Sequence, residues 1–370
     1  MNKLEIDKKI FESFTVTIIT ESSLKKYYIT ASSKIQKQSN VVFEDIINFL
    51  NAESASIVYQ FIFANLANEN NTLKKLNEIQ KVNWPISWMQ GDCCNDNCFT
   101  GSQFFAISGT ELTPIISNNK IIGSFYETEV AEFCYLANIY SDNIELSNSE
   151  QVDNTFNKIN DILHSLNMNF SNIARMWNYL DDLLSWYDDF NVTRTAFFNK
   201  HNIFKNKLTP AATGIGAANS AGAAYLGNVI AIKPKNNQIS VDEIISPMQC
   251  PALDYKSSFS RAVKIEQFES KQIYVSGTAS IEPMGKTVHI DDIKGQIELT
   301  MEVISEILSS QNITWENVSD SIAYFTKLED VKILNQFLKE NRYPDFPITI
   351  SHANICRDNL LFELELNAIK

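Results

Sequence analysis

Cysteine, histidine and long apolar runs are all scarce in this chain, and each scarcity excludes a class of protein. Six cysteines in 370 residues are too few for the disulfide framework of a small secreted domain. The longest apolar stretch, around residues 55–67, is interrupted by polar residues and is too short to span a bilayer. The first nine residues carry charges with no apolar run behind them, which is not the pattern of a signal peptide. We therefore expect a cytoplasmic protein.

The residues that could bind a metal or a nucleotide lack the spacing that such sites need. The histidines are scattered along the chain at His164, His201, His289 and His352. The cysteine cluster at residues 93–98 has no second Cys or His pair nearby to complete a zinc site. Gly214 and Gly216 do not form a full dinucleotide-binding or P-loop pattern. The sequence thus predicts no metal and no cofactor.

The charge balance narrows the choice of partner. The chain has 31 basic and 44 acidic side chains and a formal charge of −13, which argues against nucleic acid or an anionic membrane as the main partner. A small anionic substrate remains compatible with this balance, because a few arginines can form a basic pocket inside an acidic protein. The sequence leaves a homo-oligomer open.

Part of the sequence occurs twice. Residues 105–110 recur as residues 274–278, both around Ser-Gly-Thr, and residues 162–173 are echoed by residues 307–318. Two similar segments in the same order predict an αβ unit that is used twice, with a site between the halves. Length alone also suggests two domains. We expect an N-terminal domain at 1–235 that contains a divergent repeat, and a C-terminal domain at 236–370.

Hydrophobic periodicity predicts an α+β fold. A helix is expected near residues 43–63, and the C-terminal part favours strands at 259–263, 273–275, 321–325 and 361–366 with helices at 291–309 and 331–340. In the last strand, Phe362 and Leu364 face inward and Glu363 and Glu365 lie on the other face. This order predicts mixed sheets with helices packed on one face.

Several stretches resemble one enzyme family in the same order. The matching stretches are residues 190–194, 210–216, 257–262, 275–281 and 355–363. Residues 255–369 resemble the Rid (YjgF-type) fold, and the chain as a whole resembles the chorismatases, which cleave chorismate and release pyruvate. The resemblance implies two Rid-like units and a site that needs no cofactor.

The resemblance also implies roles for particular residues. The family's catalytic acid is a glutamate on the last strand, which here corresponds to Glu363. A cysteine seven residues earlier, here Cys356, accompanies formation of 3-hydroxybenzoate in the family, whereas relatives without it form a dihydroxy-cyclohexadiene acid. Residues 346–351 contain no counterpart of the arginine of simple Rid deaminases, and residues 282–286 replace the family's Gly-His-Glu-type turn.

The chemistry of an enol ether explains why these residue types are needed. Cleavage requires a proton on the vinyl carbon, and a buried Glu363 with a raised pKa could supply it. The alternative is that Glu363 and Glu365 line the solvated face of an edge strand. Cys356 is expected to shape the product rather than to act as a nucleophile, and its alternative is a small buried core residue.

The remaining candidates would bind the substrate. Two carboxylates call for arginine partners, and the candidates beside matched stretches are Arg194, Arg261 and Arg357, with Arg194 and Arg261 preferred; surface ion pairs are the alternative. Further predicted contacts are Tyr255, Thr213, Gly214 and Ser280, although Tyr255 could be a core tyrosine and Thr213 a turn residue. The sequence therefore predicts a chorismatase-like enzyme that forms 3-hydroxybenzoate. A Rid-type imine or enamine hydrolase and a non-catalytic module that binds small carboxylates remain as alternatives.

Overall fold

The structure is a computed structural model that describes residues 4–32, 39–91, 99–205, 208–268 and 270–370. Within this part of the chain, three six-stranded sheets follow one another along the sequence. The first contains β1 (Glu5–Ile10), β2 (Thr15–Glu21), β3 (Leu24–Ser32), β4 (Ser56–Ala64), β5 (Ile86–Gln90) and β6 (Phe99–Ser108), with helices α1 (Ser39–Ala52) and α2 (Glu69–Ile79).

The other two sheets have the same composition of elements. The second contains β7 (Thr113–Ser117), β8 (Lys120–Glu127), β9 (Ala131–Tyr140), β10 (Ile173–Leu180), β11 (Ala211–Gly216) and β12 (Tyr225–Pro234), with α3 (Asn148–Ser165) and α4 (Leu183–Lys200). The third contains β13 (Ile239–Ile244), β14 (Ala262–Gln267), β15 (Ser270–Ala279), β16 (Val318–Phe325), β17 (Thr349–His352) and β18 (Phe362–Ile369), with α5 (Ile293–Ser310) and α6 (Val331–Glu340).

All three sheets share one topology. Numbered within each sheet, the strands lie in the order 1-2-3-6-4-5. Strands 4 and 5 are parallel in each sheet, and the other neighbouring pairs are antiparallel. A parallel pair needs a crossover connection, and a helix supplies it in each case. One chain therefore contains the same unit three times.

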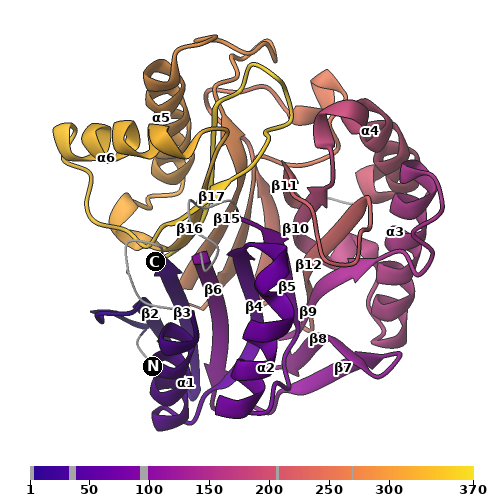
Figure 1. Ribbon diagram of the computed structural model, residues 1–370, viewed down its shortest axis with the longest axis vertical. Coiled ribbons are helices and arrows are strands. Elements are labelled where there is room, and N and C mark those ends of the chain that lie inside the picture. The colour runs from indigo at the N-terminus through magenta and orange to yellow at the C-terminus, as the bar shows by residue number, and fades with distance from the viewer. Residues whose placement is uncertain (1–3, 33–38, 92–98, 206–207, 269) are drawn as a thin grey trace.

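The three sheets pack against one another through their inner faces. Figure 1 shows the helix pairs at the periphery and the sheets between them. Contacts between strands join the sheets in a ring, in which β5 lies against β9, β11 against β15 and β17 against β6. One apolar core contains residues of all three sheets, such as Phe61, Trp177 and Tyr324. Three further cores each lie between one sheet and its own pair of helices. Both faces of each sheet are consequently covered.

The helical half of the predicted repeat is confirmed. Three successive elements end 145 residues apart in the second and third units. They are α3 and α5, the 3-10 helices Phe170–Asn172 and Trp315–Asn317, and β10 and β16. Both 3-10 helices begin with a capping box, which is formed by Asn169 with Asn172 and by Thr314 with Asn317. The repeated polar residues therefore cap equivalent turns.

The strand half of the predicted repeat is wrong. Residues 105–110 end β6, the sixth strand of its sheet, whereas residues 274–278 lie in β15, a third strand. Gly109 adopts a positive φ of 91° in a turn, while Gly277 lies in β15 at an irregularity in its pairing with β18. Short apolar strands before Ser-Gly-Thr look alike in sequence wherever they lie in a sheet.

The predicted α+β class with helices on one face of each sheet is confirmed, but the number of units is three rather than two. The first sheet was hidden because the helix expected near residues 43–63 is wrong beyond Ala52. Ser54 breaks this segment with a positive φ of 52°, and the β-branched and aromatic residues that follow form β4. The expected boundary at residues 235–236 falls between β12 and β13, and the division into two domains stays a prediction.

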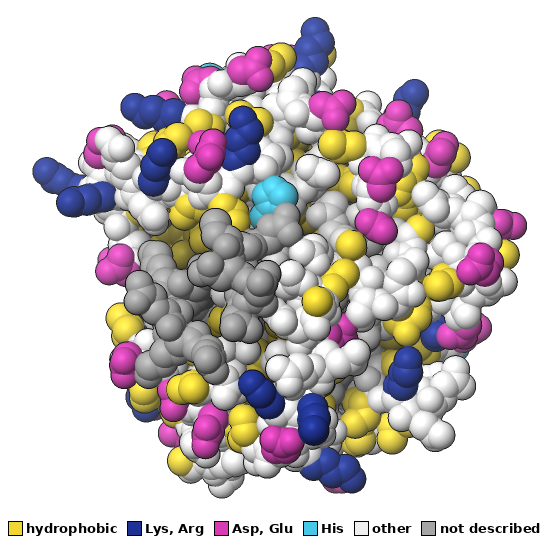
Figure 2. All heavy atoms as spheres, viewed as in Figure 1, with side chains coloured by type: hydrophobic (Ala, Val, Ile, Leu, Met, Phe, Trp, Pro, Cys, Tyr) yellow, Lys and Arg dark blue, Asp and Glu magenta, His cyan; other side chains and the backbone are white. Residues whose placement is uncertain are grey.

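The surface carries mixed charge on the face shown in Figure 2, where acidic side chains lie among basic ones. None of the helices in the described ranges is long and apolar enough to cross a membrane. The cysteine cluster at residues 93–98 lies outside the described residues.

Candidate active site

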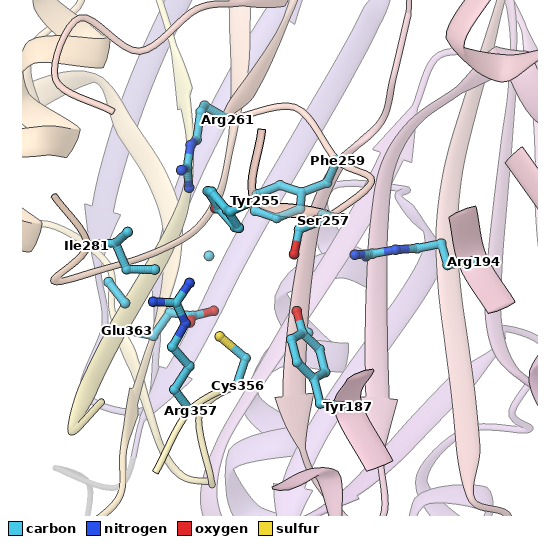
Figure 3. Close-up of a pocket in the computed structure, with 14 residues that line it drawn as sticks. Tyr187, Arg194, Tyr255, Ser257, Phe259, Arg261, Ile281, Cys356, Arg357 and Glu363 are labelled. Atoms are coloured by element: carbon cyan, nitrogen blue, oxygen red, sulfur yellow. The ribbon is translucent and has the colours of Figure 1, made fainter. Parts of the chain in front are cut away.

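A pocket lies at the interface between the second and third sheets. Figure 3 shows its side chains, which come from α4 and β11 on one side and from the third sheet and its loops on the other. The lining residues are Tyr187, Arg194, Ala212, Gly214, Tyr255, Ser257, Phe259, Arg261, Gly277, Ala279, Ile281, Cys356, Arg357 and Glu363. The inner space measures about 40 Å³ and lies beside an outer cleft of about 780 Å³, with which it shares Tyr187, Cys356 and Arg357.

Glu363 is a buried acid without a partner. Alternation along β18 directs Phe362 and Leu364 toward the core under α5 and directs Glu363 toward the other sheets. Its side chain is only 4% exposed, and within the described residues its carboxyl group forms no hydrogen bond or ion pair. Burial raises the pKa of Glu363 to about 8, and the negative charge of Glu365 adds to this effect. Glu363 is therefore mainly protonated at neutral pH, and it does not lie on a solvated strand face.

Gly277 makes room for this carboxyl group. A Cβ atom on Gly277 would lie 1.9 Å from Glu363 Oε1, which is far inside van der Waals contact. The strand pairing is irregular between Val275 and Thr278, so the backbone at Gly277 departs from regular geometry where it passes the acid. Only glycine fits at this position with Glu363 in its present orientation.

Arginine is concentrated at this site. The chain contains five arginines, and three of them, Arg194, Arg261 and Arg357, line the pocket. Figure 3 shows Arg194 entering from the side opposite Arg357 and Glu363, with Arg261 on a third side. None of the three forms an ion pair within the described residues.

Each of these arginines is held by neutral groups. Arg194, which is 2% exposed, donates to Asn191 Oδ1 at 2.6 Å and lies over the Phe190 ring at 4.8 Å. Arg261 donates through Nε and Nη2 to the carbonyl of Cys250 at 3.2 and 3.1 Å. Because their charges are not neutralised, these groups can bind anionic ligands.

Arg357 connects the pocket to the turn that departs from the family pattern. It donates to the carbonyl of Gly285 at 2.8 Å and to Thr287 Oγ1 at 3.2 Å. Gly285 has a positive φ of 81°, and a Cβ there would lie 3.0 Å from the Tyr255 ring. The turn thus supports two lining side chains, Tyr255 and Arg357.

Cys356 lines both the inner pocket and the outer cleft. It is a free cysteine, and burial raises the pKa of its thiol to about 12. The group is therefore a neutral thiol near pH 7, and it lacks the thiolate character that a nucleophile needs. Within the described residues, no group of three His, Cys, Asp or Glu side chains is placed to hold a metal ion.

Of the candidate residues from the sequence, seven line the pocket: Glu363, Cys356, Arg194, Arg261, Tyr255, Gly214 and Arg357, which was the less preferred arginine. Thr213 and Ser280 are buried next to it with side chains bonded elsewhere. Thr213 Oγ1 accepts from Arg175 at 2.7 Å and from the Gly277 amide at 2.9 Å, and Ser280 donates to the Val288 carbonyl at 3.0 Å. Thr213 faces away because its neighbours Ala212 and Gly214 face the pocket.

Sequence reasoning missed seven lining residues, which are Tyr187, Ala212, Ser257, Phe259, Gly277, Ala279 and Ile281. All of them except Tyr187 lie in the matched stretches and could have been selected there. Tyr187 lies on α4, where the helical pattern gives no hint of a pocket; burial raises the pKa of its hydroxyl, so it stays a neutral hydrogen-bonding group.

The acid has no counterpart in the other sheets. Glu363 pairs across β18 with the last residue of β15 and with Tyr324 of β16. The residue with the equivalent pairing on the sixth strand is Leu226 in the second sheet and Gly101 in the first. An acidic side chain therefore occupies this position at one of the three equivalent places.

Comparison with known proteins finds a family model on each side of the pocket. Residues 124–226 match the family model described as chorismatase FkbO/Hyg5-like, N-terminal, and residues 251–369 match the model described as endoribonuclease L-PSP. A 3-hydroxybenzoate synthase from Streptomyces hygroscopicus is 28% identical over 224 residues, which are 53% of this chain and 63% of that protein. A chorismatase from Streptomyces rapamycinicus is 26% identical over 223 residues, 54% of this chain and 64% of that protein.

The alignments thus span less than two thirds of these relatives' length. A crystal structure of a chorismatase superposes with a TM-score of 0.62 at 17% identity and covers 85% of this chain and 93% of the other, a match that concerns the fold alone. The two family models cover both sides of the pocket. The chain is thus similar to the chorismatases over residues 124–226 and to the L-PSP family over residues 251–369.

Proposed function

We propose that this protein cleaves the enolpyruvyl ether of chorismate, or of a close relative, to pyruvate and 3-hydroxybenzoate. The observation that carries the proposal is that the buried Glu363, which forms no hydrogen bond or ion pair within the described residues, shares a small pocket with arginines whose charges are not neutralised. Burial raises the pKa of Glu363 to about 8, which favours the protonated acid at neutral pH. The names of the two Streptomyces relatives support it. The proposal includes a small anionic substrate and a cytoplasmic site of action.

Glu363 is proposed to start the reaction as a general acid. Proton transfer from its carboxyl group to the terminal carbon of the enolpyruvyl group makes the ether carbon electrophilic. The bond between the ring and the ether oxygen can then break, so that this oxygen leaves as the keto oxygen of pyruvate while the hydroxyl oxygen stays with the ring. Pyruvate and 3-hydroxybenzoate together contain all the atoms of chorismate, so the overall reaction needs no external oxidant or reductant. The carboxylate left on Glu363 can accept the proton that the ring loses when it becomes aromatic.

The arginines are proposed to hold the two carboxylates of the substrate. Arg194 and Arg261 approach the pocket from different sides (Figure 3), as two separate anionic groups on one ligand require. A guanidinium group can bind each carboxylate through two parallel hydrogen bonds. The pocket is also lined by Tyr187, Tyr255 and Ser257. Their hydroxyl groups can donate hydrogen bonds to the substrate oxygens that lie between the two carboxylates.

The small inner space constrains how the substrate binds. A volume of about 40 Å³ holds only a few water molecules. A ligand of chorismate's size therefore enters from the outer cleft and displaces the side chains shared by the two spaces, Tyr187, Cys356 and Arg357.

The first prediction concerns turnover. The wild-type protein should release pyruvate from chorismate, and Glu363→Gln should lower the rate by about 100-fold or more, because it keeps the shape and removes the acid. Since the acid must be protonated, kcat/KM should be high below pH 8 and fall as the pH rises through about 8. Coupled detection of pyruvate across the pH range measures both effects.

Glu306→Gln, which alters an exposed glutamate on α5, is the matched control and should leave turnover unchanged. Near wild-type turnover by Glu363→Gln would exclude Glu363 as the acid. A protein that binds chorismate without converting it would be a carboxylate-binding module, and conversion of an enamine instead would indicate a Rid-type hydrolase.

The second prediction concerns stability and needs no substrate. The pKa of Glu363 rises from 4.5 to about 8 on folding, so between these values the folded state binds more protons than the unfolded state and stability falls as the pH rises. Gln does not titrate, and Glu363→Gln should therefore gain about 2–4 kcal/mol relative to wild type between pH 4.5 and pH 8. Urea unfolding at both pH values measures the gain. A difference that does not change with pH would contradict the buried, protonated state.

The third prediction concerns the carboxylate contacts. In the Glu363→Gln background chorismate itself can serve as a slowly converted ligand for calorimetry. Arg194→Lys and Arg261→Lys should each weaken binding by about 1–3 kcal/mol, because lysine cannot reproduce the planar fork. Arg342→Lys, at an exposed arginine that does not line the pocket, should have no effect. Equal affinity in all four proteins would remove the two arginines from the proposal.

The fourth prediction concerns the product. We expect wild type to form 3-hydroxybenzoate, and Cys356→Ala to divert part of the product to the dihydroxy-cyclohexadiene acid, because the smaller side chain admits water beside the enolpyruvyl group. Chromatography of the acids formed from chorismate gives the ratio. Cys134→Ala, at a buried cysteine of β9 that does not line the pocket, should keep the wild-type ratio. An unchanged ratio in Cys356→Ala would mean that another residue selects the product.

A further inference from the structure

A second buried carboxylate lies two residues beyond Glu363 on the same face of β18. Glu365 is 3% exposed and accepts hydrogen bonds from Arg175 Nη2 and Trp177 Nε1, both at 2.7 Å. Arg175 and Trp177 belong to β10, so this ion pair crosses from the third sheet to the second. Residues at positions i and i+2 of a strand are about 7 Å apart, and the ion pair therefore lies next to the acid.

Arg175 is also connected to the backbone beneath the acid. Its Nη2 atom donates to Thr213 Oγ1 at 2.7 Å, and the same oxygen accepts from the Gly277 amide at 2.9 Å. Gly277 is the residue whose Cα lies against the Glu363 carboxyl group. The Nη1 atom of Arg175 is buried without a hydrogen-bond partner, and within the described residues Glu365 is the one carboxylate that forms an ion pair with Arg175.

We propose that Glu365 keeps Glu363 in its acid form by neutralising Arg175, and that Arg175 in turn holds Thr213 and Gly277 behind the acid. Glu365 and Arg175 are thus positioning residues. Neither lines the pocket, and both act through Glu363. The inference rests on the proposed function for its catalytic consequence, but the state of Glu363 can be measured without a substrate.

Nearby charges of both signs act on the pKa of Glu363, so the loss of one negative charge can change its protonation. After burial, the negative charge of Glu365 is the largest influence that raises the pKa of Glu363, and the positive charges of Arg175 and Arg261 lower it. The titratable and charged groups that face Glu363 are Glu365 on β18, Arg175 on β10, Arg261 before β14, Tyr255 of the 3-10 helix Ala252–Tyr255, Tyr187 and Arg194 on α4, and Cys356 and Arg357 before β18. Without Glu365, the cations would favour the Glu363 carboxylate.

The test is the pH profile of Glu365→Gln. The amide oxygen can still accept a hydrogen bond, but the negative charge is lost, and Arg175 then acts on Glu363 without compensation. The fall of kcat/KM at high pH should move to lower pH by about one unit or more, so turnover at pH 8 should drop about fivefold or more further than turnover at pH 6. Glu266→Gln, at a half-buried glutamate of β14 that pairs with Lys264 outside the pocket, should leave the profile in place.

A double variant separates charge from structure. Arg175→Gln combined with Glu365→Gln removes both charges and should return the high-pH fall toward its wild-type position, even if its maximum rate is lower. This variant also serves where Glu365→Gln alone folds poorly, because it leaves no unpaired buried charge. A rate that falls equally at all pH values in Glu365→Gln, with the profile in place, would overturn the proposal.

A measurement without substrate distinguishes failure of this inference from failure of the proposed function. In protein labelled with 13C at glutamate carboxyl groups, the signal lost in Glu363→Gln reports the titration of Glu363. Its midpoint should move to lower pH in Glu365→Gln and return in the double variant. An unmoved midpoint refutes the inference whether or not chorismate is converted, and a shifted midpoint without turnover supports the inference and rejects the chorismatase proposal.

Discussion

The inner faces of the three sheets bury one another, and the polar side chains on these faces must therefore find partners inside the protein. On β18 the polar residues that face the other two sheets are Glu363, Glu365 and Asn367, all less than 5% exposed. Asn367 donates to Asp320 at 3.0 Å, and Glu365 is paired with Arg175. Among these three residues, Glu363 alone has no hydrogen-bond or ion-pair partner in the part of the chain that the structure describes, and it is the one that reaches the pocket.

This arrangement explains how a carboxylic acid can persist in a folded protein near neutral pH. An unpaired carboxylate would be costly to bury, so the group retains its proton instead. The helices on the outer side of the third sheet supply the apolar core that holds β18 in place, and the second sheet closes the inner side. Packing elsewhere in the protein thus compensates for the stability that the buried Glu363 costs. Such compensation is common at sites that depend on a group with a perturbed pKa.

Much of the third sheet could be predicted from the sequence, because local signals are strong there. The apolar spacing of α5 and the range of α6 agree with the structure, and the alternation along β18 assigned its two faces correctly. Alternation cannot tell what covers the polar face, so the burial of Glu365 was not predictable. Its partners on β10 are about 190 residues away in sequence, although a lone Arg175 within a buried strand is a local hint of an ion partner.

A chain that contains all three units can change one interface without changing the others. In an assembly of three identical subunits, any substitution would appear at every interface, and an unpaired buried acid would destabilise the assembly three times. Here Gly101 and Leu226 occupy the places that correspond to Glu363, so the burden of the acid is confined to one interface. The covalent connection of the units thus allows two interfaces to specialise in holding the molecule together while the third acquires reactive chemistry.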